Sequence, residues 1–260
     1  MSSIITIFVI MIILACFVWL DFILRLFYAF APRKTAYTLG LRYEDRAIQL
    51  IFSLLHTYRG FKVRFESRLE SPLPRRFLVV SNHQSLFDIP VLMRVLPKGA
   101  KARFVAKKSL GRGIPLISFI LQRMGHCLVQ QSGDAVHAIE AIETMTRRCK
   151  REGTIPVIFP EGHRSTSGAL GEFHSAGYRK ILEVDPLPIL VVCVDGGWKY
   201  AKLSDFFKGF GNDPYTVRFV RLLPRPENRA QTKESLVLSR QLIAEALEDI
   251  RKETGHSYYI

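Results

Sequence analysis

His83 and Asp88 are two residues whose types and spacing are suited to acid–base chemistry. They lie in the polar stretch 81–88, directly after the short apolar run 77–80. On one continuous helix, side chains five residues apart would not share a face. With His83 in a loop and Asp88 in the first turn of the next helix, the carboxylate can meet the imidazole. One ring nitrogen would then be fixed, and the other would be free to take a proton.

Structural roles are also compatible with this stretch. Ser85 and Asp88 have the spacing of a helix capping box, with Ser85 as the N-cap and Asp88 at the third helical position. His83 could be a loop histidine bonded to the backbone. The catalytic alternative is half of a hydrolase triad without an obvious nucleophile, so the attacking group would be a hydroxyl of the substrate.

A second polar group follows the buried apolar run 155–159. Gly162 permits a tight turn, and Arg164 carries a planar guanidinium that matches the geometry of phosphate. Glu161 could hold that guanidinium in place or bond a hydroxyl of an acceptor. The alternative is a surface ion pair between Glu161 and Arg164 at the end of a strand.

The elements that must position these residues alternate along the chain. Strand-length apolar runs separated by helical patterns predict an α/β domain with a mostly parallel central sheet flanked by helices. The loop after residue 80 would then lie at the carboxyl edge of the sheet, where such proteins hold their sites. The expected strands are 61–66, 77–80, 103–106, 127–130, 155–159, 187–194 and 216–223. The expected helices are 88–95, 115–124, 134–151 and 233–252.

The N-terminal segment predicts a membrane anchor. Residues 4–20 are almost entirely apolar, and a helix of that length measures about 26 Å against a bilayer core of about 30 Å. This segment could be one tilted span, or it could enter and leave one leaflet. A cleaved signal peptide is disfavoured, because no Lys or Arg precedes the run. Residues 43–58 form an amphipathic pattern that either packs on the domain or lies in the membrane interface. We therefore divide the chain into an anchor, 1–59, and an α/β domain, 60–260, that holds both polar motifs.

The formal net charge of +14 over 260 residues suits nucleic acid, an anionic bilayer or an acidic substrate. We expect no nucleic-acid partner, because the chain has no nucleic-acid-binding motif and such a protein gains little from an apolar N-terminus. Basic residues follow the apolar run, so by the positive-inside rule we expect the rest of the chain on the cytoplasmic face. These residues are Arg25, Arg33, Lys34 and Arg42.

The four cysteines are far apart in the sequence, and no histidine stands at metal-ligand spacing from any of them. We expect free thiols in a reducing compartment and no metal site. The chain has neither a Walker loop nor a dinucleotide-binding glycine motif, so no cofactor is expected.

Taken together, the two polar motifs resemble those of the glycerolipid acyltransferase family. The first is Asn82-His83-x4-Asp88 and the second is Phe159-Pro160-Glu161-Gly162-x-Arg164-Ser165, in the order and at the separation typical of the family. The likeness runs from about residue 60 to residue 195 and includes the apolar block 186–192. The branch that looks most similar is that of the 1-acylglycerol-3-phosphate acyltransferases.

This resemblance implies a membrane-bound enzyme of phospholipid synthesis. It would transfer a fatty acyl group from acyl-CoA or acyl carrier protein to the free hydroxyl of 1-acylglycerol-3-phosphate. His83 would be the base and Asp88 its orienting partner. The implied acceptor-binding residues are Glu161, Gly162, Arg164 and Ser165. Membrane lipids and the acyl donor are the expected partners, and the oligomeric state is not predicted.

Gln131 departs from the family pattern, because it stands where an acceptor-binding arginine is usual. A glutamine donates hydrogen bonds without a charge, so a charge-assisted contact to phosphate is missing. Arg123 or Lys107 could substitute, or the acceptor could be another lysophospholipid or an amino-containing lyso-lipid. A non-catalytic membrane lipid-binding protein is the alternative of another class, and it would need neither His83 nor Asp88.

Overall fold

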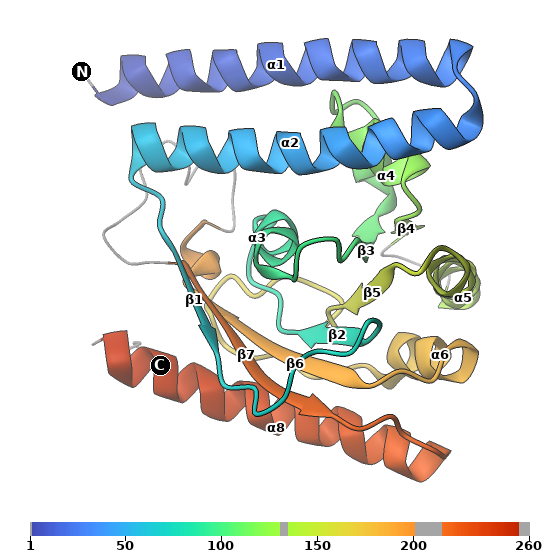
Figure 1. Ribbon diagram of the computed structural model, residues 1–260. Coiled ribbons are helices and arrows are strands. Elements are labelled where there is room, and N and C mark those ends of the chain that lie inside the picture. The colour runs from blue at the N-terminus through green and yellow to red at the C-terminus, as the bar shows by residue number, and fades with distance from the viewer. Residues whose placement is uncertain (1, 131–134, 201–214, 255–260) are drawn as a thin grey trace.

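A seven-stranded sheet forms the centre of the molecule (Figure 1). The computed structural model describes residues 2–130, 135–200 and 215–254. The strand order is β1-β7-β6-β2-β5-β3-β4, and the strands from β6 to β4 are all parallel. β7 pairs antiparallel with β6, and β1 runs parallel to β7. The predicted α/β fold with a mostly parallel sheet is confirmed. The strands are β1 (Val63–Ser67), β2 (Leu78–Ser81), β3 (Ala102–Lys107), β4 (Cys127–Val129), β5 (Ile155–Ile158), β6 (Ile189–Asp195) and β7 (Tyr215–Leu223).

The helices agree with the expected ones except at two places. The helix expected from residue 43 begins at Arg33, and α6 was not predicted at all. Residue 134, the expected first residue of α5, lies outside the described residues. The helices are α1 (Ser2–Phe30), α2 (Arg33–Arg59), α3 (Asp88–Val95), α4 (Ile117–Arg123), α5 (Ala135–Glu152), α6 (Ser175–Val184) and α8 (Arg229–Thr254), with short 3-10 turns η1 (Lys108–Gly111) and η2 (Gly197–Tyr200).

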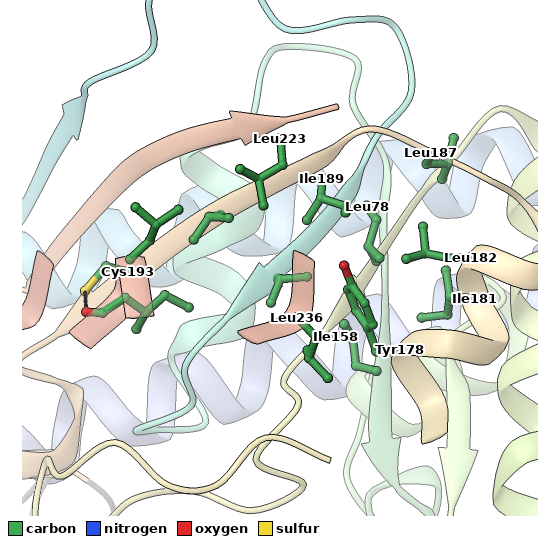
Figure 2. Close-up of a cluster of buried hydrophobic side chains, with 14 of the residues drawn as sticks. Leu78, Ile158, Tyr178, Ile181, Leu182, Leu187, Ile189, Cys193, Leu223 and Leu236 are labelled. Atoms are coloured by element: carbon green, nitrogen blue, oxygen red, sulfur yellow. Dashed lines mark hydrogen bonds between the residues drawn. The ribbon is translucent and has the colours of Figure 1, made fainter. Parts of the chain in front are cut away.

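The sheet is covered on both faces because successive side chains of a strand point to opposite sides. Leu78 and Val80 of β2 join the core beneath α5, α6 and α8, whereas Val79 joins the core beneath α2 and α3. Figure 2 shows part of the first of these cores, where strand residues pack against Tyr178 of α6 and Leu236 of α8. A strand buried on both faces has to be apolar throughout, which explains the short unbroken runs in the sequence.

Helices α1 and α2 form an antiparallel hairpin beside the domain (Figure 1). By length and composition, the segment Met11–Phe30 of α1 is able to cross a membrane, and it is the single candidate within the described residues. Its large apolar side chains are mostly exposed, and its two charges, Asp21 and Arg25, pair with each other at 2.7 Å. The boundary at residue 59 remains a prediction.

Helix α2 is tied to the domain by apolar and ionic contacts. Phe52 and Leu55 belong to the core beneath α3. Nearer the start of α2, Oε2 of Glu44 lies 3.4 Å from Nη1 of Arg103 on β3, and Oε1 lies 3.2 Å from Nε2 of His126. All three polar side chains are almost fully buried. A buried charge persists only when it is paired, so this cluster fixes the position of α2 relative to β3.

Candidate active site

The loop after β2 is held to the neighbouring strand β6 by two buried amide side chains. Asn82 donates from Nδ2 to the carbonyl of Val194 and accepts from its N–H, both at 2.8 Å. Gln84 donates to Oδ1 of Asp195 at 3.1 Å and accepts from the N–H of Gly197 at 3.0 Å. These contacts leave His83, between the two amides, in a fixed backbone position at the carboxyl edge of the sheet.

His83 and Asp88 form a hydrogen-bonded pair. The chain turns after His83, and α3 begins at Asp88, so the carboxylate reaches back to Nδ1 of the imidazole at 2.5 Å. The same oxygen, Oδ2, accepts the N–H groups of Gln84 at 2.7 Å and of Ser85 at 2.9 Å. Because Asp88 is an acceptor, Nδ1 carries the proton of the neutral ring. The lone pair of Nε2 is then the one that can accept a proton.

The capping-box alternative is correct only in part. The N–H of Ser85 does bond to the Asp88 carboxylate, as in a capping box. The helix, however, begins at Asp88 and not two residues before it, and the hydroxyl of Ser85 accepts from Phe87 rather than from the N–H of Asp88. The carboxylate therefore serves the turn and the imidazole at the same time.

The imidazole of His83 is stacked on the ring of Phe159, with the ring centroids 4.2 Å apart and an interplanar angle of 14°. Phe159 follows β5, the neighbour of β2 in the sheet. The side chain of His83 remains 15% exposed, whereas that of Asp88 is fully buried. The stack and the carboxylate fix the ring, and the residual exposure gives a substrate access to it.

Glu161 joins the two motifs through backbone contacts. Its Oε1 accepts the N–H of His83 at 2.7 Å, and its Oε2 accepts the N–H of Gly171 at 2.8 Å. Burial raises the pKa of Glu161 above its ordinary value, although both N–H donors oppose that effect. The contacts of Glu161 bring the loop after β5 against the loop after β2. Binding of an acceptor hydroxyl by this residue remains a prediction.

The expected acceptor-binding residues Gly162, Arg164 and Ser165 lie in the loop after β5, which contacts the loop of His83 through Ser165. Gly162 has a φ of 71°, which favours glycine, and its N–H donates to the carbonyl of Phe159. The N–H of Ser165 donates to the carbonyl of His83 at 2.8 Å. Arg164, adjacent to that contact, is exposed. Gln131 lies outside the described residues.

The backbone N–H groups around His83 are already used within the protein. Those of Gln84 and Ser85 donate to Asp88, and that of His83 itself donates to Glu161. An oxyanion hole needs donors aimed at the reacting carbonyl. These three groups, the nearest candidates in the sequence, point instead at carboxylates.

Two residues of this site carried no signal in the sequence. The hydroxyl of Tyr215, the first residue of β7, donates to Oδ1 of Asp88. Arg251 of α8 donates to Oδ1 of Asp195 at 3.2 Å and to the carbonyl of Gly168 at 2.5 Å. Both residues come from the last third of the chain, far from either motif, and neither stands in a recognisable pattern.

The cysteines do not supply an alternative nucleophile. Burial raises the pKa of Cys127 to about 12 and raises that of Cys193 further, so both thiols stay protonated. The four described cysteines are all free, and Cys16 lies in α1. Among the residues that the structure describes, no group of three or more His, Cys, Asp and Glu side chains could hold a metal ion.

The chain is similar in sequence to known acyltransferases. The chain is 27% identical over 194 residues to a human 1-acyl-sn-glycerol-3-phosphate acyltransferase beta, covering 71% of this chain and 66% of that protein. It is 32% identical over 121 residues to the 1-acyl-sn-glycerol-3-phosphate acyltransferase of Cocos nucifera, covering 46% and 38%. The corresponding enzyme of Saccharomyces cerevisiae is 26% identical, with 72% and 59% covered. The chain thus spans about two fifths to two thirds of the length of these relatives.

The fold is also found in a solved structure. The crystal structure of the 1-acyl-sn-glycerophosphate (LPA) acyltransferase PlsC from Thermotoga maritima has a TM-score of 0.65 and 22% sequence identity. The match covers 96% of this chain and 98% of that one. The family model described as Acyltransferase matches residues 62–195, which include both motifs and half of the chain. The chain therefore belongs to the Acyltransferase family.

Proposed function

We propose that this protein transfers a fatty acyl group from a thioester donor, acyl-CoA or acyl carrier protein, to the free hydroxyl of 1-acylglycerol-3-phosphate. The observation that carries the proposal is the His83–Asp88 pair, held at 2.5 Å and joined through Glu161 to the loop of Arg164. A poised base beside an exposed arginine suits an alcohol that carries a phosphate group. The names of the related enzymes describe the same acceptor.

In this mechanism Nε2 of His83 takes the proton of the acceptor hydroxyl as its oxygen attacks the thioester carbonyl. The buried carboxylate of Asp88 stabilises the imidazolium that forms. When the tetrahedral intermediate collapses, the C–O bond remains, the C–S bond breaks, and the imidazolium gives its proton to the leaving sulfur. The substrate supplies the nucleophile, so no acyl-enzyme is needed.

Arg164 is assigned to the phosphate of the acceptor. It is exposed, and the neighbouring Ser165 is bonded to the backbone of His83. A guanidinium can form two parallel hydrogen bonds to phosphate, which fixes the acceptor as well as attracting it. The missing arginine at position 131 favours a second candidate acceptor, a lysophospholipid with a head group or an amino-containing lyso-lipid.

Helix α1 is assigned to the membrane. The segment Met11–Phe30 has the length and composition of a span, and its exposed apolar side chains need an apolar environment. By the positive-inside rule, the basic residues after the segment favour the cytoplasmic face for the domain. An acceptor that resides in the bilayer would then diffuse to the enzyme in two dimensions.

The test uses the full-length protein in detergent and measures ester formation from acyl-CoA and from acyl carrier protein. The acceptors are 1-acylglycerol-3-phosphate, lysophosphatidylcholine, lysophosphatidylethanolamine and an amino-containing lyso-lipid. We expect the highest kcat/KM with 1-acylglycerol-3-phosphate. Preference for another acceptor would replace the assigned substrate, and no ester with any acceptor from folded protein would overturn the acyltransferase assignment.

A further inference from the structure

Tyr215 lies at the active site because β7 pairs antiparallel with β6, unlike the other pairs of neighbouring strands that the structure describes. The five parallel strands end at the edge that carries the two motifs, and a parallel β7 would begin at the opposite edge. Since β7 runs against β6, its first residues lie beside the last ones of β6, with Thr216 opposite Asp195. The pairing thus brings Tyr215 to the carboxyl edge of the sheet.

The hydroxyl of Tyr215 donates to the oxygen of Asp88 that the rest of the site leaves unused. Oδ2 of Asp88 already accepts His83 Nδ1 and the N–H groups of Gln84 and Ser85. Oδ1 accepts the hydroxyl of Tyr215. A fully buried carboxylate is costly unless its oxygens find donors, and here both oxygens have one.

The ring of Tyr215 is fixed by its surroundings. It is 2% exposed, and its centroid lies 5.8 Å from that of Phe61. On another side the ring lies against Gly197, where an added Cβ would be 2.6 Å from the hydroxyl oxygen. Gly197 is itself bonded to Gln84, next to His83. The hydroxyl is therefore directed at Asp88 by packing from several elements.

We propose that Tyr215 is a positioning residue for the His83–Asp88 pair, because its hydroxyl fixes the Asp88 carboxylate and shares its negative charge. The inference rests on the proposed acyltransferase function and adds a member to the same site. Tyr215 lies outside the region 62–195 that the family model matches. Because Tyr215 is almost fully buried, we assign it a role through Asp88 and not through contact with the substrate.

A positioning role for Tyr215 predicts the direction in which the pH dependence of activity shifts when its hydroxyl is removed. Without the hydroxyl, the charge of Asp88 acts more fully on His83 and stabilises the imidazolium. His83 then keeps its proton to a higher pH, and less of it is available as a base. The other charged or titratable groups around the loop are unchanged by this substitution. They include Glu161, His163 and Arg164 after β5, Asp195 at the end of β6, and Arg251 of α8, which reaches the loop through Asp195 and Gln84.

The experiment compares the full-length variants Tyr215→Phe and Tyr178→Phe. Both variants keep a buried ring and lose a hydroxyl. Tyr178 of α6 is the control, because its hydroxyl lies in the other core and is hydrogen-bonded to Ser235 at 2.7 Å, not to Asp88. We expect Tyr215→Phe to lower kcat about three- to tenfold at neutral pH, with both KM values within about twofold. The acid limb of its kcat/KM profile should move to higher pH. Tyr178→Phe should leave that limb in place even if it lowers the melting temperature.

A second measurement does not depend on turnover. NMR titration of 15N-labelled histidine follows His83 directly, with His83→Ala used to assign its signals. We expect the midpoint of His83 to rise in Tyr215→Phe and to stay in place in Tyr178→Phe. An unchanged midpoint in Tyr215→Phe overturns the positioning role, as do unchanged kinetics in an active enzyme. If the parent protein is inactive but the titration midpoint of His83 still rises in Tyr215→Phe, the proposed reaction is refuted. The coupling of Tyr215 to His83 through Asp88 is then retained.

Discussion

The backbone N–H of His83 donates to the carboxylate of Glu161 at 2.7 Å, although 78 residues separate them in the chain. This contact crosses from the loop after β2 to the loop after β5, which are neighbouring parallel strands. It sets the distance between the base and the loop that carries Arg164. The two motifs are one physical unit, and predictions for either must take the other into account.

Replacement of the base should remove transfer without unfolding the protein. His83→Ala deletes the proton acceptor, and Asp88→Asn deletes the charge that stabilises the imidazolium. We expect kcat to fall by about two to four orders of magnitude in each variant. Circular dichroism and thermal unfolding in detergent check that the fold is kept. Turnover of His83→Ala within tenfold of the parent would contradict the assignment of the base.

Replacement of Arg164 should act on the acceptor. Arg164→Ala removes a charge-assisted contact to phosphate, and we expect the apparent KM for 1-acylglycerol-3-phosphate to rise about 10- to 100-fold. The KM for the thioester should change little. Arg147→Ala is the matched control, because Arg147 is an exposed arginine of α5 paired with Glu143. An effect of Arg164→Ala confined to the donor would contradict the role given to this residue.

The raised pKa of Glu161 makes its contribution to stability depend on pH. A carboxyl whose pKa is higher in the folded state than in the unfolded state binds more protons when folded. Its favourable contribution is complete below the unfolded pKa and is lost as the pH rises through the folded pKa.

Glu161→Gln does not titrate, so the stability of the parent relative to this variant should decline over the same interval and then level off. Urea unfolding in detergent at a series of pH values measures the difference. A difference that grows with rising pH would show that the carboxylate is the form that the fold favours.

Substitution in the buried cluster of Glu44, Arg103 and His126 should lower the free energy of unfolding far more than substitution in a neighbouring surface ion pair. Glu44→Ala leaves Arg103 buried without its counter-charge, and we expect a loss of about 3–5 kcal/mol of unfolding free energy. The control is Asp45→Ala on the same helix. The carboxylate of Asp45 is half exposed and pairs with Lys101, so we expect a loss of about 0–1 kcal/mol. Similar losses in the two variants would mean that Glu44 does not fix α2.

The predictable parts of this protein are those encoded in short stretches. Apolar runs such as 77–80 and 155–159 identified β2 and β5, and the polar residues after them identified the site. The pairing of His83 with Asp88 could be predicted because one turn of chain connects them. That local geometry needs no knowledge of the rest of the fold.

The missed parts depend on distant segments. Helix α6 was not predicted, although its buried residues, Tyr178, Ile181 and Leu182, stand at helical spacing. Gly177 looks unfavourable for a helix, yet an added Cβ there would lie 2.9 Å from Ile142 of α5, so the close packing of the two helices requires it. The contact of Tyr215 with Asp88 requires the antiparallel direction of β7, which no local pattern specifies.

The position of α8 limits how the chain can be shortened. The region that the family model matches ends at residue 195, so a fragment that ends there would still contain both motifs. Such a fragment would lack Arg240, which donates to the carbonyl of Gly171, and Arg251, which donates to that of Gly168. The segment that follows Arg164 would lose these contacts with the C-terminal helix. We therefore expect a fragment that keeps this segment in place to extend to the last turn of α8.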